Sequence, residues 1–303
     1  MKISWFPGHM KKAVDSLSSD LKSISVVLNV LDARCPLSSM NPILGELFKN
    51  KPIIYLLNKE DLSSVKINME WISYFQNKGI NAVLISCKTG AGRKKLLKFL
   101  DLQRQGFLKK HQDKYLERKA LGRNYYIKKA FRIGVVGVPN AGKSSVINIL
   151  APQKRAKTGK KPGLTRGKQW LKLKDGMEIL DSPGIMPPRI DLPEASWKLG
   201  AVGIIKQEIL PVEEIVLKLI SFLINKKVFN SSIFGDSNED YTKMDPLQVL
   251  KEFTHTRRIL KAGGRIDVDK ACIQILKMFR EGKTGRISLE RPEEFTIKDG
   301  EKE

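Results

Sequence analysis

Short apolar runs that end abruptly in polar loops dominate the first two thirds of the chain. Runs of this length, rich in Val, Ile and Leu, predict strands buried on both faces of a parallel sheet. They lie at 26–31, 53–57, 82–85, 132–136 and 177–180. Segments with helical spacing separate them, at 10–22, 41–49, 68–78, 92–102 and 143–150. This alternation predicts an α/β fold whose ligands bind at the carboxyl ends of the strands.

Two further segments complete this α/β part. Residues 104–129 form a charged connector that is expected to be largely helical. Residues 167–174 are expected to form a strand that pairs with 177–180, because the Asp175-Gly176 pair between them is a strong hairpin signal.

After about residue 185 the pattern changes, and amphipathic helices replace the strands. Helices are expected at 210–223, 246–260 and 268–280. The last has apolar residues that share one helix face, namely Val268, Ala271, Cys272, Ile275 and Phe279. Asp267 is placed to cap its N-terminus and Gly282 to follow its C-terminus. We therefore expect an α/β domain over 1–191, an all-helical domain over 192–289 and a charged tail over 290–303.

A glycine-rich segment with GxxxxGKS spacing, Gly137–Ser144, follows the predicted strand 132–136 and precedes a helix. That context is what a phosphate-binding loop, or P-loop, requires. Its backbone N–H groups and the helix N-terminus favour phosphate. Lys143 would reach the β- and γ-phosphates as a catalytic residue, and Ser144 would ligate Mg²⁺. Nucleotide contacts are expected from Pro139, Asn140, Ala141, Gly142, Lys143, Ser144 and Ser145.

Two segments beyond the P-loop would respond to the γ-phosphate. The first is a DxxG sequence, Asp181–Gly184, directly after the strand 177–180. Asp181 would hold Mg²⁺, and Gly184 would offer its N–H group to the γ-phosphate. The second is Thr165, the candidate Mg²⁺ ligand on a switch segment.

A guanine-reading motif, Asn58-Lys59-Glu60-Asp61, follows the buried strand 53–57. The carboxylate of Asp61 would accept two hydrogen bonds from guanine N1–H and N2–H₂, a donor pair that adenine lacks. Lys59 would lie over the base, and Asn58 would tie this loop to the P-loop. The loop after the next strand would complete the base pocket with backbone N–H groups directed at guanine O6; its residues are Ser86, Cys87 and Lys88. The set predicts binding and hydrolysis of GTP.

The order of these motifs differs from that of Ras-like GTPases, which run P-loop, switch threonine, DxxG, NKxD and SxK. Here the guanine motifs at 58–61 and 86–88 precede the P-loop at 137–144. We therefore expect a circularly permuted Ras-like GTPase domain, with the same strands and a different chain break. This break attaches the helical domain directly to the DxxG segment, as a lever for switching.

Composition and charge add a class of partner. The 303 residues include 55 Lys and Arg against 32 Asp and Glu, a formal net charge of +23. Such an excess favours polyanions such as nucleic acid or an acidic membrane surface. Residues 151–174 hold nine basic and no acidic side chains, and 104–129 hold nine basic and two acidic ones. The helical part adds Arg257, Arg258, Lys261, Arg265, Lys277, Arg280 and Arg286.

Cysteine usage and hydropathy indicate a compartment. The three cysteines, at 35, 87 and 272, are far apart and form no CxxC pair, which fits a reducing compartment better than a disulfide framework. No apolar run approaches the roughly 20 residues that span a bilayer. We expect a cytoplasmic protein.

With these residues in place, the sequence resembles the RbgA/YlqF family of circularly permuted ribosome-biogenesis GTPases. The segments Trp5–Met10 and Asp32–Pro36, the permuted motif set and the basic helical C-terminal part carry the resemblance. It implies GTP hydrolysis coupled to a late step in assembly of the large ribosomal subunit. It also implies low intrinsic activity that rises on the subunit, and rRNA contact through an ANTAR-like helical module. Neither DNA nor a membrane is an expected partner. Asp32 and Arg34 match the family's DAR motif, to which the residues themselves assign no role beyond a loop at a strand end.

The resemblance also implies two catalytic features. Ile185 stands where Ras-like enzymes place a water-orienting Gln. By resemblance, His9 is the catalytic histidine that replaces this Gln, and Asn140 is a ligand of an activating K⁺. From residue type alone, Asn140 is better explained as a turn residue.

Two alternatives stay open. A GTP-gated signalling or membrane-surface module would bind anionic lipid through the same basic surface, although no basic amphipathic helix with bulky aromatic residues stands out. An ATPase would need only the P-loop, and Asp61 argues against it.

Overall fold

The computed structural model describes residues 22–121, 130–151, 169–173, 176–181, 184–186, 194–205, 211–229, 234 and 243–296. The predicted helix at 10–22 lies outside these residues except at its end. His9, Thr165 and Asp175 also lie outside them, as does the side chain of Asp181.

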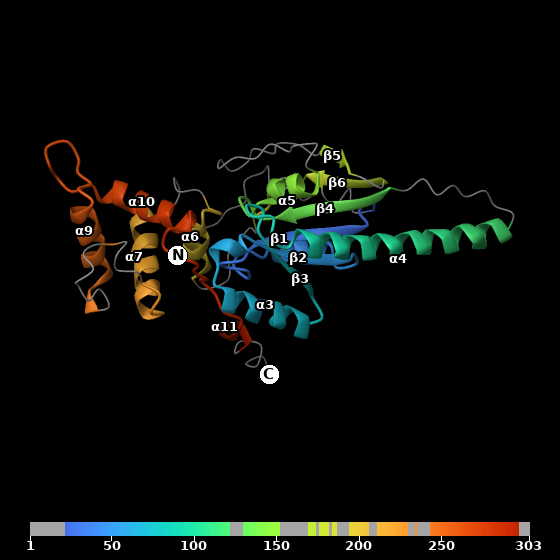
Figure 1. The fold of residues 1–303 in the computed structure, drawn as a ribbon, viewed down its shortest axis with the longest axis horizontal. Helices are drawn as coiled ribbons and strands as arrows, with labels where there is room; N and C mark the ends of the chain where they lie inside the picture. Colours follow the sequence, from blue (N-terminus) through green and yellow to red (C-terminus); the bar gives the residue numbers. More distant parts are fainter. Residues whose placement is uncertain are drawn as a thin grey trace.

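A six-stranded sheet forms the centre of the fold, in the order β3-β2-β1-β4-β6-β5 (Figure 1). Its strands are β1 (Val26–Asp32), β2 (Ile53–Asn58), β3 (Asn81–Ile85), β4 (Phe131–Gly137), β5 (Gln169–Lys172) and β6 (Met177–Asp181). All neighbours are parallel except β5, which pairs antiparallel with β6 at the edge. All six predicted strands are confirmed, and the five apolar runs agree within one residue at either end.

The sheet order shows the permutation directly. β3, β2 and β1, which come first in the chain, occupy one half of the sheet, and β4, β6 and β5 occupy the other. The P-loop strand β4 is the fourth strand in sequence, yet it lies in the middle of the sheet beside β1. The fold class, an α/β circularly permuted GTPase domain followed by helices, is therefore confirmed.

Helices cover both faces of the sheet. On one face, alternate residues of β1 such as Val26 and Leu28 join a core with α4 (Arg93–Ala120) and α5 (Lys143–Leu150). On the other face, Val27 packs near α2 (Pro42–Leu47) and Leu31 packs near α3 (Val65–Asn77). Every residue of β1 is buried, including Asn29 and Asp32, which explains why apolar residues dominate this strand.

The predicted helix at 92–102 and the largely helical connector after it form one continuous helix. α4 runs unbroken for 28 residues, about 42 Å at 1.5 Å per residue, so the helical prediction for the connector is confirmed as far as residue 120. No proline interrupts the segment. Leu96 and Leu100 pack against the sheet, whereas Leu108 and Leu116 are exposed. Figure 1 shows the second half of α4 projecting beyond the sheet.

The C-terminal part consists of helices, as predicted. They are α6 (Ala195–Val202), α7 (Val212–Asn225), α9 (Pro246–Thr256), α10 (Val268–Arg280) and the short α11 (Glu293–Thr296). The bounds of α10 agree with the prediction, Asp267 caps it by accepting the Lys270 N–H, and Gly282 follows its C-cap residue with φ 77°. α9 ends four residues before the predicted Leu260. The chain turns at Arg258, with φ 49°, into an isolated bridge between Leu260 and Ile266.

Helix α6 was missed because it has no apolar stripe. Seven of its eight residues are buried, including Lys198, so it has no polar face toward solvent, as expected of a helix inside a larger core. It packs between the sheet and α7 and α10. Among the described residues, no helix is long and apolar enough to cross a membrane.

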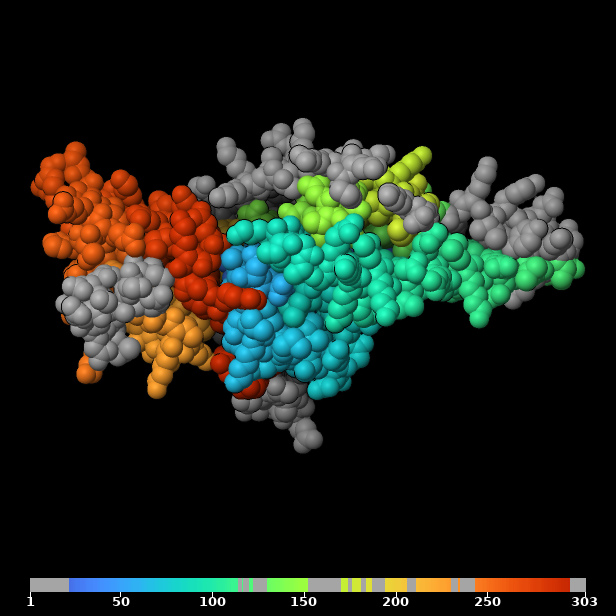
Figure 2. All heavy atoms as spheres, viewed as in Figure 1, coloured from blue at the N-terminus to red at the C-terminus, as the bar shows by residue number. Residues whose placement is uncertain are grey.

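The last described residues return to the α/β domain. Glu290, the first residue of the predicted tail, is almost fully buried and accepts a hydrogen bond from the backbone N–H of Leu37. In the space-filling view the C-terminal segment, in red, meets the N-terminal strands and helices, in blue (Figure 2). The two parts of the chain thus share a packed interface.

Candidate nucleotide-binding site

The P-loop connects β4 to α5 at the centre of the sheet. Asn140 and Gly142 both have positive φ, 56° and 101°. A Cβ atom on Gly142 would collide with the side-chain amide of Asn58, so only glycine fits there. Lys143 is buried, and its Nζ donates to the Val138 carbonyl 2.9 Å away. The loop therefore wraps the N-terminus of α5, where anions bind favourably.

Asn58 joins the guanine motifs to the P-loop. Its Nδ2 donates to the Ala141 carbonyl over 2.8 Å, and its Oδ1 accepts from the Cys87 N–H over 3.3 Å. One buried amide thus holds three loops together at the carboxyl edge of the sheet. The tie expected between Asn58 and the P-loop is present, and the nucleotide-binding roles of these residues stay predictions.

The other guanine-motif residues lie at the same edge. Asp61 belongs to the single 3₁₀ turn η1 (Glu60–Leu62) and is partly buried. Ser86 follows β3, which pairs with β2 so that Ile85 lies beside Asn58. Its Oγ accepts the Thr89 N–H over 3.1 Å, which fixes the loop that holds Cys87 and Lys88.

Lys59 binds the carboxylate of Asp32, a residue of the DAR motif. Its Nζ lies 2.8 Å from Oδ2 of the buried Asp32, whose carboxylate also accepts from Nε and Nη2 of Arg34 over 2.9 and 2.8 Å. Burial by itself would raise the pKa of Asp32. The charges and hydrogen bonds of Arg34 and Lys59 outweigh burial and hold this pKa well below its usual range. The side chains of Asp32 and Arg34 therefore anchor the guanine loop, which comprises residues 59–63.

The DxxG segment crosses directly over the P-loop. A Cβ atom on Gly184 would lie 2.8 Å from Pro139 Cα, and the Ile185 N–H donates to the Gly137 carbonyl over 3.2 Å. Ile185, which replaces the usual Gln, is buried and apolar, and its carbonyl accepts from Asn41 Nδ2. An aliphatic side chain cannot orient water.

The available donors fit Mg²⁺. Ser144 stands in the first turn of α5, and Asp181 ends β6 beside Val135 of the P-loop strand. A hydroxyl and a carboxylate are the hard oxygen ligands that this cation prefers.

Asn140 contacts the helical part of the chain. Its Nδ2 donates to the Gly203 carbonyl over 2.7 Å. An amide nitrogen with this role cannot bind a cation, so any K⁺ ligand at this residue is Oδ1. The turn conformation predicted for Asn140 from its residue type is present, with φ 56°.

Gly203 ends a row of four carbonyls at the C-terminus of α6, each of which accepts from a side chain. Arg280 donates to Gly200 and Ala201 over 2.7 and 2.9 Å, and Arg34 donates to Val202 over 3.4 Å. Burial, followed by the charge of Arg34, lowers the pKa of Arg280 to about 10. Helix C-termini favour cationic partners of this kind.

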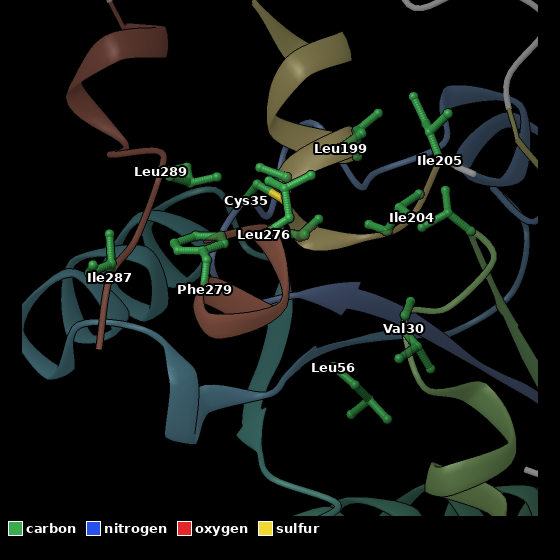
Figure 3. Close-up of a cluster of buried hydrophobic side chains, with 14 of the residues drawn as sticks. Val30, Cys35, Leu56, Leu199, Ile204, Ile205, Leu276, Phe279, Ile287 and Leu289 are labelled. Atoms are coloured by element: carbon green, nitrogen blue, oxygen red, sulfur yellow. The ribbon is translucent and has the colours of Figure 1, made fainter. Parts of the chain in front are cut away.

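Apolar packing supports the same junction. In Figure 3, Leu199 of α6 and Leu276 and Phe279 of α10 gather around Cys35, which follows the DAR motif. Arg280 and Arg286 were predicted to contact a polyanion. Both guanidinium groups instead donate to backbone carbonyls of this chain.

Comparisons with known proteins agree with this geometry. A family described as "50S ribosome-binding GTPase" matches residues 132–260, beginning at β4 and therefore after the guanine motifs. Ribosome biogenesis GTPase A of Bacillus cereus is 36% identical over 304 residues, covering 100% of this chain and 99% of that protein. The protein of the same name from Thermotoga maritima is 33% identical, with 97% and 96% covered.

Solved structures show the same fold. The crystal structure of GNP-bound YlqF from T. maritima has a TM-score of 0.66 at 29% identity, with 93% of this chain and 99% of that chain covered. The names of these relatives favour ribosome assembly over the signalling or membrane-surface alternative.

Proposed function

Because the chain belongs to the ribosome biogenesis GTPase A family, and is thus a GTP hydrolase of ribosome assembly, we propose that it acts on the immature large ribosomal subunit. Its nucleotide state sets its affinity for rRNA, and hydrolysis at a late assembly step releases it. Intrinsic turnover is low and rises on the subunit. The protein works in the cytoplasm, which suits its three free cysteines.

The observation that carries the GTP-binding part of this proposal is the Asn58 amide bridge. It brings the guanine motif, the loop of Cys87 and the P-loop to one sheet edge despite their permuted order. In the proposed site the base lies against Lys59 and Asp61, with the loop Ser86–Lys88 beside it. The phosphates lie over the P-loop backbone and Lys143. The proposed nucleotide contacts are Asn58, Lys59, Asp61, Ser86, Cys87, Lys88, Pro139, Asn140, Ala141, Gly142, Lys143, Ser144, Ser145, Thr165, Asp181 and Gly184.

GTPases of this kind generally use Mg²⁺, and we assign Ser144, Asp181 and Thr165 as its ligands. The bound cation offsets phosphate charge. In the proposed mechanism Lys143 neutralises the β- and γ-phosphates, His9 orients water in place of the missing Gln, and Oδ1 of Asn140 ligates K⁺. A K⁺ held there would add positive charge beside the phosphates, as an arginine finger does.

The rRNA contacts are proposed for the exposed cations of the α9–α10 connection, namely Arg257, Arg258, Lys261 and Arg265. Further contacts come from the basic residues of 104–129 and 151–174. This choice excludes Arg280 and Arg286, whose guanidinium groups are engaged within the chain. A net charge of +23 and clustered exposed cations support RNA as the partner.

The main test measures GTP hydrolysis with and without large subunits, in K⁺ and in Na⁺. We expect turnover to rise with subunits and to fall when Na⁺ replaces K⁺. Asn140→Ala should lose the preference for K⁺. Equal rates in both salts would remove K⁺ from the mechanism, and no rise with subunits would contradict the assembly role.

A second test is co-sedimentation with large subunits in GTPγS. Binding should weaken by orders of magnitude between 50 and 200 mM salt, since phosphate contacts release counterions (about 10³–10⁵-fold for six to ten contacts). The double change Arg257→Ala with Arg258→Ala should weaken binding. Lys66→Ala, an exposed cation on α3 away from this surface, is the matched control. Absence of co-sedimentation at low salt would refute the rRNA partner.

A further inference from the structure

A strap of residues after α10, Thr284–Glu290, runs along the segment that follows the guanine motif. Arg286 donates from Nη2 to the Glu60 carbonyl over 2.6 Å and from Nε to the Ser63 carbonyl over 2.9 Å. The Ile287 N–H donates to the Leu62 carbonyl over 3.0 Å. The helical part of the chain thus holds the guanine loop through hydrogen bonds to the backbone carbonyls of that loop.

Two more hydrogen bonds extend these contacts on either side. The Ser64 N–H donates to Ser288 Oγ over 3.1 Å. The Leu289 N–H donates to the Arg34 carbonyl over 2.7 Å. Arg34 in turn holds Asp32, which binds Lys59. Both residues expected to touch the base, Lys59 and Asp61, therefore lie on backbone that the strap supports.

The strap is firmly held at its far end. The Glu290 carboxylate accepts from the N–H of Leu37 over 2.9 Å and from the N–H and hydroxyl of Ser38. Its carbonyl accepts from Trp71 Nε1 over 3.2 Å, and Leu289 is completely buried. The near end continues from α10, whose Arg280 binds α6. A strap fixed at both ends can position what it contacts.

The guanine loop has little structure of its own. η1 is three residues long, a single turn with poorer hydrogen-bond geometry than an α-helix. Within it the Leu62 N–H donates to the Lys59 carbonyl over 2.9 Å, and the Ser63 N–H reaches Glu60 only at 3.4 Å. Asp61 lies between Glu60 and Leu62, and the carbonyls of both accept from the strap. The Glu60 carbonyl also accepts from Ser63 Oγ over 3.2 Å and from Asn68 Nδ2 of α3 over 3.4 Å. The place of Asp61 is thus set jointly by the loop, α3 and the strap.

We propose that Arg286 is a positioning residue for guanine recognition. Through the carbonyls of Glu60 and Ser63 it holds the turn that aims the Asp61 carboxylate at the base, so that the helical domain contributes to nucleotide selectivity. This inference rests on the proposed role of Asp61 as the guanine reader. It gives the helical domain a connection to the base, in addition to its covalent connection to the DxxG segment.

The coupling is reciprocal. A guanine nucleotide that orders the η1 turn also favours the docked strap, and anything that loosens the strap weakens guanine binding by the same factor. A partner bound to the helical domain would act on nucleotide affinity by this route without touching the phosphates.

The test is Arg286→Ala in the full-length protein, with Kd values for GDP and IDP. Inosine lacks the 2-amino group, so Asp61 would make two hydrogen bonds to guanine and one to hypoxanthine. We expect GDP affinity to fall about tenfold and the preference for GDP over IDP to shrink about threefold to fivefold. Arg286 is half-exposed, with 45% of its side-chain surface accessible, so the fold should tolerate this change.

Three companion variants make the result decisive. Lys283→Ala removes an exposed cation that immediately precedes the strap and pairs with Glu281, and should leave both Kd values unchanged. Arg286→Lys should restore part of the preference, because an ammonium group can reach one of the two carbonyls. Asp61→Asn should abolish the preference.

Each outcome has a separate meaning. If Asp61→Asn removes the GDP preference and Arg286→Ala leaves it within twofold of wild type, the positioning role is overturned and the guanine site stands. An equal loss for GDP and IDP in Arg286→Ala would indicate a structural role only and also overturns it. If Asp61→Asn keeps the preference, the guanine assignment itself fails.

Discussion

Asp32 lies fully buried between two cations, Arg34 and Lys59. Burying a charge is costly unless it is paired and hydrogen-bonded, and here the carboxylate has both kinds of partner. The sequence contained the residues but no sign of this arrangement, because a DAR triplet after a strand does not reveal which distant lysine meets the carboxylate. Asn58 was predictable, since its partner lies in a motif with a known position.

Asp32→Asn should destabilise the protein by about 3–5 kcal/mol, because it leaves Arg34 buried without a counter-charge. The folded-state pKa of Asp32 is depressed, so its contribution is fully present above the unfolded value near 3.9 and is lost as pH falls through the folded value. Chemical denaturation from pH 7 to pH 2 measures both effects. The difference in the free energy of unfolding between wild type and variant should stay constant above about pH 5 and shrink below about pH 4. A gap that widens in acid would contradict this account. Glu46→Gln, at an exposed pair with Lys49, is the control and should have little effect.

His9→Ala should preserve nucleotide affinity and slow hydrolysis, because the proposed role of His9 is to orient the attacking water. Single-turnover GTP hydrolysis on large subunits, with affinity measured separately, separates the two effects. General acid–base or water-positioning groups typically contribute about 10²–10⁴-fold. Unchanged turnover on the subunit would remove His9 from the mechanism.

At the level of elements, the strands could be predicted from the sequence and some helices could not. Strands of a doubly covered parallel sheet are continuous apolar runs, which stand out in sequence. α6 is short and buried on nearly all sides, so its sequence shows no apolar stripe to detect. α3 begins at Val65, three residues before the prediction, because Val65 and Lys66 form an exposed first turn outside the apolar pattern. The contacts of the strap could not be predicted from the sequence, because its main partners are backbone carbonyls, which every residue has.

The long helix α4 offers a matched pair of glycine substitutions. Gly106 lies within α4, and a Cβ atom there meets open space, so Gly106→Ala should stabilise the helix by about 0.5–1 kcal/mol. Gly92, just before α4, has φ 77°, and a Cβ atom there would strike the Leu84 carbonyl, so Gly92→Ala should destabilise. Denaturation curves and hydrogen exchange along α4 measure the two changes. Destabilisation by Gly106→Ala would show that α4 is not a regular helix at that point.

At the level of the whole molecule, the proposed nucleotide site spans the two halves of the sheet. The guanine residues come from the half with β2 and β3, and the phosphate residues come from the half with β4 and β6. The site residues at each strand end could be listed from sequence. Their connection to the helical domain, through Asn140, Arg34 and Arg286, required the structure.

A ligand that spans both halves should stabilise the fold as a unit. GDP at a hundred times its Kd should raise the free energy of unfolding by about 2.7 kcal/mol, and ADP at the same concentration should have no effect. Thermal unfolding with Mg²⁺ and each nucleotide measures this. Lys143→Ala is the control and should abolish the gain. Equal stabilisation by ADP would show that the base pocket is wrongly assigned.

The order of the strands also decides when the protein becomes active during its own synthesis. Translation delivers β1, β2 and β3 first, so the strands of the base-binding half are made while the P-loop strand is still inside the ribosome or not yet synthesised. The edge of β1 that β4 will cover stays open during that interval. A nascent chain therefore holds half of a nucleotide site and cannot enter the GTP cycle. Only after β4 and α5 have joined β1 are both halves of the proposed nucleotide site present. The strap, which is synthesised later still, then completes the guanine loop.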